Sequence, residues 1–301
     1  INSNREGYFE IKIDESIELI KVSAAGYKPV KVKLQELTES GNKIEIKPIS
    51  IRHFDDIVVY DSPGSDKTSR AKKRYANLDD VLPDYEGINM ITRANFAKEP
   101  MVRGQSGERV AVTIDGMKVF PACVDNMDPI SSYVEMNNFK KIEVSRGGFD
   151  FDNAQNSGSA LNFITQKPEF GNSFYSIAET GYESAKTLRF LNSTFNLAHE
   201  NIALRGAFDV KKSDFYYAGN SKKIENSGFE KNNIKLDLSW KLPNNHRLLA
   251  GAIIDNAYNM GYPALIMDAT RAQARMYSID HQWSNPAEGI SSIDSKIYFN
   301  T

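Results

Sequence analysis

Residues 115–129 read Asp-Gly-Met-Lys-Val-Phe-Pro-Ala-Cys-Val-Asp-Asn-Met-Asp-Pro, and residues 139–147 read Phe-Lys-Lys-Ile-Glu-Val-Ser-Arg-Gly. A strand-like run, Val110 to Ile114, leads into Asp115-Gly116, which is a strong turn signal. A second strand-like run, Lys141 to Val144, follows the insert. The insert holds the only cysteine of the chain, Cys123, in a Cys-x-x-x-Met spacing with Met127. Two strands around a sulfur-bearing insert therefore form the centre of the chain.

Composition excludes several classes of protein. A length of 301 residues allows one to three domains. A formal net charge of -2 gives no electrostatic footprint for nucleic acid, so no nucleic-acid partner is expected. A single cysteine excludes an intrachain disulfide framework, and no apolar run is long enough to predict a transmembrane helix. The first residues lack signal-peptide features and the last lie in a strand-like segment, so we expect both ends to lie inside a larger protein.

The first 77 residues divide into two parts. Residues 1–48 contain four apolar or alternating runs, at 7–13, 17–22, 30–34 and 43–47, and predict a small β-sandwich. Residues 49–77 carry a short extended piece followed by a linker composition. An extended piece on a tether can add itself as a strand to a partner's sheet, or it can be an ordinary edge strand of a neighbouring domain. The piece consists of Asp55, Asp56, Ile57, Val58, Val59 and Tyr60.

Residues 78–168 predict a compact α/β unit. A short helix at 78–83 is stopped by Pro83, and a second helix is expected at 133–136. Strands are expected at 88–91, 109–114 and 139–147, and the segment 156–165 closes the unit.

Residues 169–301 alternate between apolar and polar side chains, which is typical of strands with one apolar face. Short connections near 198–201, 243–246 and 284–290 alternate with long ones at 213–231 and 257–274. About seven strands fit. The clearest apolar sets are Ile202, Leu204, Phe208 and Val210, then Ile234, Leu236, Leu238, Trp240 and Leu242, and finally Ile293, Ile297 and Phe299.

The order of these parts resembles a known family. The leucine-rich helix, Arg103-Gly104, the strand ending in Asp115-Gly116, the Ile-Glu-Val-x-Arg-Gly strand and the segment 158–165 resemble the plug of TonB-dependent outer-membrane receptors. One departure is Gly158-Ser159-Ala160, where the family usually has a glycine pair. Residues 1–48 resemble part of the carboxypeptidase-regulatory-like domain that precedes the plug in receptors of Bacteroidota. Residues 55–60 resemble a TonB box.

The resemblance implies a mainly β chain in four parts. These are a partial β-sandwich (1–48), a TonB box and linker (49–77), an α/β plug domain (78–168) and the first strands of a barrel (169–301). The barrel would be antiparallel and transmembrane, with about 22 strands in all. The location would be the bacterial outer membrane, with the N-terminal domain and the TonB box in the periplasm.

The resemblance also implies active uptake and no enzymatic activity. The partners would be TonB with its inner-membrane energising complex, outer-membrane lipid and, as a further candidate, a surface lipoprotein. No cofactor is required. The rival class is a β-rich adhesion or interaction protein, which would explain the alternation but not the ordered plug motifs. A lone-cysteine enzyme is disfavoured because no histidine partner is evident among His53, His199, His246 and His281.

The substrate is predicted from the sulfur-containing side chains of the insert. Thiolate and thioether are soft donors that select Cu(I) over hard ions. The Cys-x-x-x-Met-Asp-Pro string of Cys123 and Met127 is similar to that of TonB-dependent copper receptors, which pair it with a His-x-Met motif. No His-x-Met occurs here, and the nearest substitutes are Met260 and Met267 in a long connection. A copper ion is therefore the predicted substrate. A siderophore, a peptide or a glycan stays open as the substrate, since the same cysteine and methionines could simply be packed in a hydrophobic core.

Overall fold

The computed structural model describes residues 19–22, 30–33, 44, 58–60, 76–121, 123, 125–145, 159–171, 174–263, 265, 267–287 and 290–301. The chain divides into two units, residues 1–54 and 55–301. In the first, β1 (Leu19–Val22) pairs antiparallel with β2 (Val30–Lys33), and Ile20 lies opposite Val32. These strands fall within two of the four runs predicted there. The other two runs lie outside the described residues, apart from Ile44.

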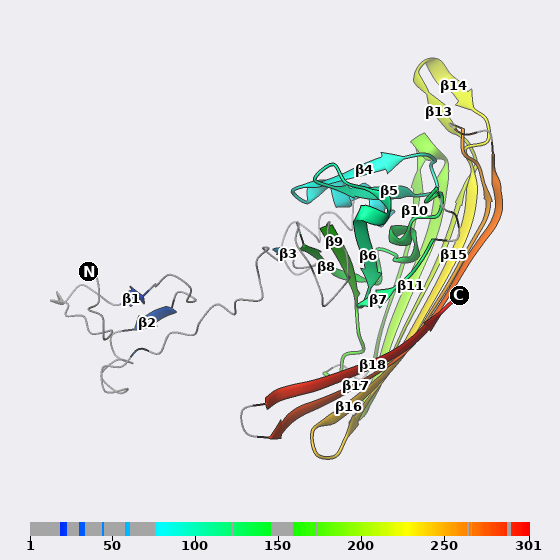
Figure 1. Ribbon diagram of the computed structural model, residues 1–301. Helices are drawn as coiled ribbons and strands as arrows, with labels where there is room; N and C mark the ends of the chain where they lie inside the picture. The colour runs from blue at the N-terminus through cyan, green and yellow to red at the C-terminus, as the bar shows by residue number, and fades with distance from the viewer. Residues whose placement is uncertain are drawn as a thin grey trace. The chain divides into compact units, whose positions relative to one another are not determined.

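The centre of the second unit is a five-stranded sheet in the order β3-β8-β9-β6-β7 (Figure 1). Strand β6 runs parallel to β9, and the other neighbours are antiparallel. Buried side chains such as Phe139, Ile142, Leu161 and Phe163 form its core. The strands are β3 (Val58–Tyr60), β6 (Val110–Ile114), β7 (Met117–Lys118), β8 (Phe139–Ser145) and β9 (Ser159–Thr165).

A hairpin and four 3-10 turns complete this domain. The hairpin joins β4 (Ile88–Thr92) to β5 (Lys98–Val102). The turns are η1 (Leu78–Asp80), η2 (Leu82–Asp84), η3 (Gly107–Arg109) and η4 (Ile130–Tyr133). In the described part of the chain, no helix has the length and apolar character needed to cross a membrane.

Both predicted helices were wrong in detail. The helix expected at 78–83 is two short turns, and Pro83 stands near the start of the second turn, where its missing N–H costs nothing. The helix expected at 133–136 ends at Tyr133, because Val134 is extended at φ -109° and ψ 123°. With this extended backbone, the Glu135 side chain reaches the neighbouring seven-stranded sheet.

That neighbour, the wall sheet, has seven antiparallel strands in the order β10-β11-β12-β15-β16-β17-β18. This confirms the expected number of strands and the alternation of short and long connections. Figure 1 shows the plug elements lying against one face of the wall sheet. Its strands are β10 (Phe174–Glu183), β11 (Leu188–His199), β12 (Ile202–Ser213), β15 (Phe229–Leu242), β16 (His246–Met260), β17 (Ala269–Ala287) and β18 (Ile290–Asn300).

The long connection from β12 to β15 carries small elements of its own. Strands β13 (Tyr216–Ala218) and β14 (Lys222–Ile224) form a hairpin around η6 (Gly219–Ser221). The turn η5 (Ser184–Lys186) joins β10 to β11. Because the strands are antiparallel, this end of the sheet also holds the 261–268 connection, whereas the short turns lie at the opposite end.

The two faces of the wall sheet differ as the alternation predicted. On β12 and β15 the apolar face is exposed, and Ile202 and Trp240 keep 49% and 48% of their surface open. The polar residues between them are buried against the plug side, as Arg205, Asp209 and Asp237 show. Exposed apolar side chains on a long sheet suit lipid, and buried polar side chains suit a filled lumen.

A buried ionic contact joins the plug to the wall sheet. The Glu135 carboxylate accepts hydrogen bonds from Lys211 Nζ and, at 2.6 Å, from Lys231 Nζ. Lys231 also pairs with Asp255 at 3.2 Å. Burial alone would raise the pKa of Glu135, but the two lysines lower it to about 2. The carboxylate is therefore charged at neutral pH, and its two partners come from adjacent wall strands.

We expect Glu135→Gln to unseat the plug, because it removes the carboxylate that two buried ammonium groups share and leaves Lys231 with Asp255 alone. Breaking a buried pair from one side costs about 3 to 5 kcal/mol. Thermal unfolding in detergent, together with proteolysis of residues 76–145, measures the loss. The matched control is Glu230→Gln, which breaks the exposed Lys212–Glu230 pair between the same two strands and should change little. Equal effects of the two variants would contradict this assignment.

Candidate functional site

Three of the four predicted sulfur residues meet in one place. Cys123 and Met127 come from the loop after β7, and Met260 is the last residue of β16. Met127 and Met260 are buried in one apolar cluster, and the partly buried Cys123 packs against it. We call these three residues the sulfur cluster. Neighbouring members of the same apolar group are Ala94, Phe96, Ala97, Leu188, Phe229 and Tyr262.

The loop that carries Cys123 is held by its own aspartate. Asp128 Oδ1 accepts the Cys123 backbone N–H at 3.0 Å, and its Oδ2 accepts the Tyr133 hydroxyl at 2.8 Å. The Asn126 N–H donates to the Cys123 carbonyl at 3.0 Å, which closes a turn. Asn126 adopts φ 50°, a conformation that asparagine tolerates better than most residues. The spacing Cys-x-x-x-Met-Asp thus builds a closed loop that presents both sulfur atoms.

Tyr262, two residues after the end of β16, binds this loop by a hydrogen bond. Its hydroxyl donates to the Met127 carbonyl at 2.7 Å, and its backbone N–H donates to Asp268 at 3.1 Å. Burial raises the pKa of Tyr262, and the nearby Asp128 and Cys123 raise it further. Tyr262 therefore stays protonated and keeps its donor role.

Gly261 allows the close approach that places Tyr262. A Cβ at this position would lie 2.0 Å from the Asn226 carbonyl oxygen, so no larger residue fits. The Gly261 N–H donates to the Gly228 carbonyl at 2.9 Å. The end of β16 is therefore locked to the connection that precedes β15.

A cavity of about 530 Å³ opens beside Cys123. It is bounded by the Cys123 loop, by β6 and by the start of β5. The buried Glu99 in its lining accepts hydrogen bonds from the Gly107 N–H at 2.8 Å and from Asn126 Nδ2 at 3.1 Å. Glu99 also pairs with Arg93. A small ligand in this cavity would reach the thiol.

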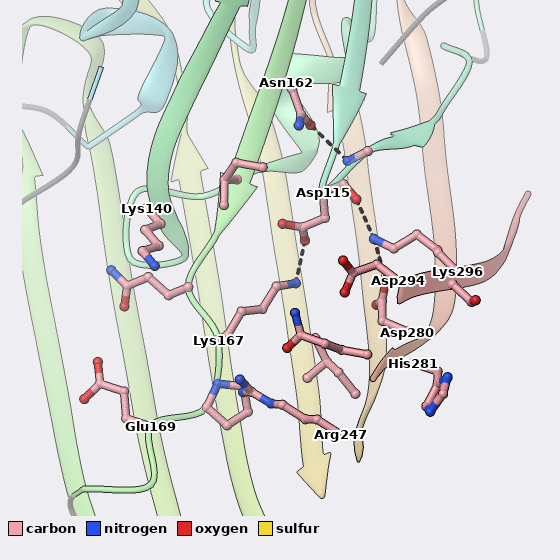
Figure 2. A pocket seen from close by; sticks show the side chains of 17 residues that line it. Asp115, Lys140, Asn162, Lys167, Glu169, Arg247, Asp280, His281, Asp294 and Lys296 are labelled. Carbon is pink, nitrogen blue, oxygen red and sulfur yellow. Dashed lines mark hydrogen bonds and ion pairs between the residues drawn. The ribbon is translucent and has the colours of Figure 1, made fainter. Parts of the chain in front are cut away.

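A second cavity, of about 870 Å³, is lined by charged side chains and lies between the plug and β16 to β18 (Figure 2). Lys167 Nζ reaches Asp115 Oδ2 at 2.9 Å, and Lys296 Nζ lies between the Asp115 carbonyl and Asp280. The Gly116 N–H donates to Asn162 Oδ1 at 2.9 Å. The turn at Asp115-Gly116 thus contacts both β9 and β18.

Asp115 is held in its charged form. Burial alone would raise the pKa of Asp115, but Lys167, Lys235 and hydrogen bonds from Thr165 lower it to about 2. The Thr165 hydroxyl lies 2.6 Å and its N–H 2.9 Å from the carboxylate. The turn is therefore tied to β9 by charge as well as by backbone pairing.

Comparison with known proteins agrees with this geometry. The sequence model of the TonB-dependent receptor plug domain matches residues 65–160. Over these residues the sequence is thus similar to the plug domain of TonB-dependent receptors. A search of curated protein sequences gives no match.

Solved structures show the same fold of plug and partial barrel. One is the copper transporter OprC, with TM-score 0.66 and 18% identity over 75% of this chain and 34% of that one. Another is the FrpB iron transporter from Neisseria meningitidis, with TM-score 0.64, 11% identity and coverage of 76% and 38%. A third is the ferric enterobactin receptor of Pseudomonas aeruginosa, with TM-score 0.57, 16% identity and coverage of 76% and 39%.

The chain thus spans a little over a third of the length of these receptors. The wall sheet has the fold of the corresponding part of the barrels of these structures. The matched family consists of receptors and not of enzymes.

The other predicted residues of the receptor fall in different places. Met267 is 56% exposed and lies apart from the sulfur cluster. Of the predicted TonB box, Val58, Val59 and Tyr60 form β3 on the edge of the plug sheet, and Val59 lies opposite Glu143. Asp55, Asp56 and Ile57 lie outside the described residues.

Two histidines that are far apart in the sequence meet in the receptor wall. His246 Nδ1 and His281 Nε2 are 2.9 Å apart, and His246 stacks on Trp283. The sequence analysis did not predict this contact, because the register of β16 against β17 decides it. Within the described ranges no group of three or more His, Cys, Asp and Glu residues is arranged to hold a metal ion.

The lowered pKa of Asp115 predicts acid sensitivity. The carboxylate has a pKa of about 2 when folded and 3.8 in its unperturbed form, so its stabilisation is complete above pH 4 and is lost as the pH falls through 2. We expect Asp115→Asn to lower the free energy of unfolding by about 2 kcal/mol at pH 7 and to flatten the decline between pH 4 and 2. Unfolding at a series of pH values measures both effects. The exposed Asp84→Asn is the control, and an unchanged profile in Asp115→Asn would refute the role of this carboxylate.

Proposed function

We propose that this protein is a receptor that takes up copper across the outer membrane with energy supplied through TonB. The observation that carries the proposal is the convergence of Cys123, Met127 and Met260 between the plug and the end of β16. Met260 is more than a hundred positions away from Cys123 and Met127 in the chain, so local packing of one segment does not bring it to them.

The chemistry of the sulfur cluster favours Cu(I). One thiolate and two thioethers are soft ligands that bind Cu(I) and discriminate against hard ions. A Cu(I) ion bound to one thiolate carries no net charge, which suits an apolar surround, whereas Cu(II) or Fe(III) would leave a buried excess charge. Binding would release the thiol proton, so affinity should increase as the pH rises.

The placement of the sulfur cluster suits uptake. Met260 and Tyr262 belong to the end of the wall sheet that has the long connections, which in outer-membrane barrels is the outer side. The plug loop and the wall share the ligand set, so movement of the plug would pull Cys123 and Met127 away from Met260. Removal of ligands in this way would release the ion toward the periplasm.

A siderophore is the alternative substrate. The cavity of about 530 Å³ beside Cys123 has the size of many small-molecule sites. Two of the similar solved structures, FrpB and the ferric enterobactin receptor, are named for iron or an iron complex. The sulfur cluster is not what hard Fe(III) requires, and it therefore favours copper.

Metal analysis of the reduced protein tests the substrate. We expect about one Cu(I) per chain. Cys123→Ala and Met260→Leu should each lower the affinity at least tenfold, because each variant loses a soft sulfur ligand while the new side chain is no larger than the old one. Met276→Leu is the matched control, since Met276 is equally buried but belongs to the other apolar cluster. Equal copper content in all variants would reject the copper site.

We further propose that β3 is the segment that TonB captures. It is a three-residue edge strand held only by β8 among the described strands, so it can exchange that partner for a strand of TonB. Strand β8 pairs with β9, and β9 is bonded to the Asp115 turn that precedes the Cys123 loop. A pull on β3 would therefore act on the layer that positions the sulfur cluster.

A disulfide lock tests the capture of β3. Val59 and Glu143 are register partners, so the double variant Val59→Cys, Glu143→Cys should form a disulfide that keeps β3 on β8. We expect the oxidised form not to bind the purified periplasmic domain of TonB and the reduced form to bind it. Val59→Cys alone is the control, and copper content should stay unchanged in both. Binding of TonB by the oxidised double variant would contradict the proposal.

A further inference from the structure

A row of polar side chains crosses the wall sheet at one level on the face toward the plug. Glu179 on β10 lies opposite Asn192 on β11, which lies opposite Asp209 on β12. Asp209 lies opposite Asn233 on β15, and Asn233 lies opposite Asp255 on β16. Acids and amides therefore alternate over five adjacent strands, and we call these residues the polar row.

One half of the polar row is fully paired. Asn233 Nδ2 donates to Asp255 Oδ1 at 2.6 Å and lies 3.2 Å from the Tyr133 carbonyl of the plug. Asp255 also pairs with Lys231 at 3.2 Å. This half needs no further ligand.

In the other half, oxygen atoms of Asp209 and Asn192 lack partners within the described part of the chain. Asp209 is 1% exposed, and neither of its carboxylate oxygens has a hydrogen-bond partner. Asn192 is 5% exposed, and its Oδ1 has none. The side chain of Asn137 on the plug approaches Asp209 and also has no well-formed hydrogen bond. Leaving such groups unsatisfied costs several kcal/mol, so native structures rarely do so.

The two lysines near Asp209, Lys211 and Lys231, have no donor left for it. An ammonium group has three N–H donors. Those of Lys211 go to Glu135, to the Ala76 carbonyl and to Asn77.

The donors of Lys231 are engaged as well, whereas Nε and Nη1 of Arg205 have no hydrogen-bond partner in the described part of the chain. The donors of Lys231 go to the Ser132 carbonyl, to Glu135 and to Asp255. Arg205 binds the Asn137 carbonyl and Gln166. Of the three buried carboxyl groups here, Glu135 and Asp255 accept from the ammonium groups of Lys211 and Lys231, so the charged form of Asp209 has no ammonium partner.

A cavity of about 590 Å³ adjoins the unpaired half of the row. Asn137, Glu179 and Asn192 line it together with Thr180 and Thr194. The lining thus combines carboxylate, amide and hydroxyl oxygens from the plug, β10 and β11. Oxygen atoms of these kinds are the ligands of hard cations, and Ca²⁺ accepts six to eight of them in flexible arrangements.

We propose that the unpaired half of the polar row binds a hard divalent cation of the calcium type. Asp209 and Glu179 supply carboxylate oxygens, and Asn192 and Asn137 supply amide oxygens. The cation balances the charge of Asp209 and joins three wall strands to the plug. The site is independent of the sulfur cluster, because hard oxygen ligands do not select Cu(I).

Calcium binding to the protein in detergent tests the proposal after removal of metals with EDTA. Equilibrium dialysis with calcium chloride should give about one bound Ca²⁺ per chain, and Asp209→Asn and Asn192→Leu should each weaken binding at least tenfold. The matched control is Asn196→Leu. Asn196 is on the same strand and face and is equally buried, but its amide is paired with the Glu169 backbone at 3.0 and 2.9 Å.

Thermal unfolding separates a cation site from a merely structural residue. Calcium should raise the Tm of the wild type and of Asn196→Leu, and should leave Asp209→Asn unchanged. In EDTA, Asp209→Asn should be more stable than the wild type, since it removes the unpartnered carboxyl group. Absence of bound calcium in the wild type, or equal binding by Asp209→Asn, would overturn the proposal. Copper content measured on the same samples keeps this result separate from the copper assignment.

Discussion

The buried contact between Glu135 and the two lysines Lys211 and Lys231 is the constraint on which the arrangement of plug and wall depends. Two ammonium groups on adjacent strands have lost their water, and one plug carboxylate accepts a hydrogen bond from each of them. Loss of that carboxylate would leave Lys231 with Asp255 and would remove the charged partner of Lys211 in a medium that solvates ions poorly. This contact therefore fixes the position of the plug along β12 and β15. The other contacts between the plug and the wall sheet depend on that position.

The sulfur cluster is one contact that depends on the position of the plug. Met127 belongs to a plug loop closed by Asp128, and Met260 belongs to the end of a wall strand. Each would be an ordinary buried methionine if the layers were shifted by one residue pair. Tyr262 shows that the contact is specific, because its hydroxyl bonds the Met127 carbonyl across the interface. The sulfur cluster is therefore shared by the plug loop and the wall, and its arrangement depends on how the two are placed.

Sequence reasoning succeeded where the signal is local. Alternation predicted which side chains of β12 and β15 face outward, because successive side chains of a strand point to opposite faces. The order of short motifs predicted the plug. Local signals failed at Val134, where the contact of Glu135 with the wall requires an extended backbone in place of a helix. They also failed for His246 and His281, whose contact depends on pairing between strands.

The sequence alone thus determined the strand periodicity, the plug motifs and the presence of soft ligands at a Cys-x-x-x-Met spacing. Only the tertiary structure decided that Met260 joins Cys123 while Met267 stays exposed, and that Asp209 is left without a partner beside two fully engaged lysines. The reason is physical. Periodicity follows from the geometry of each residue and its neighbours, whereas these outcomes depend on interstrand register and on the position of the plug, which many distant contacts set together.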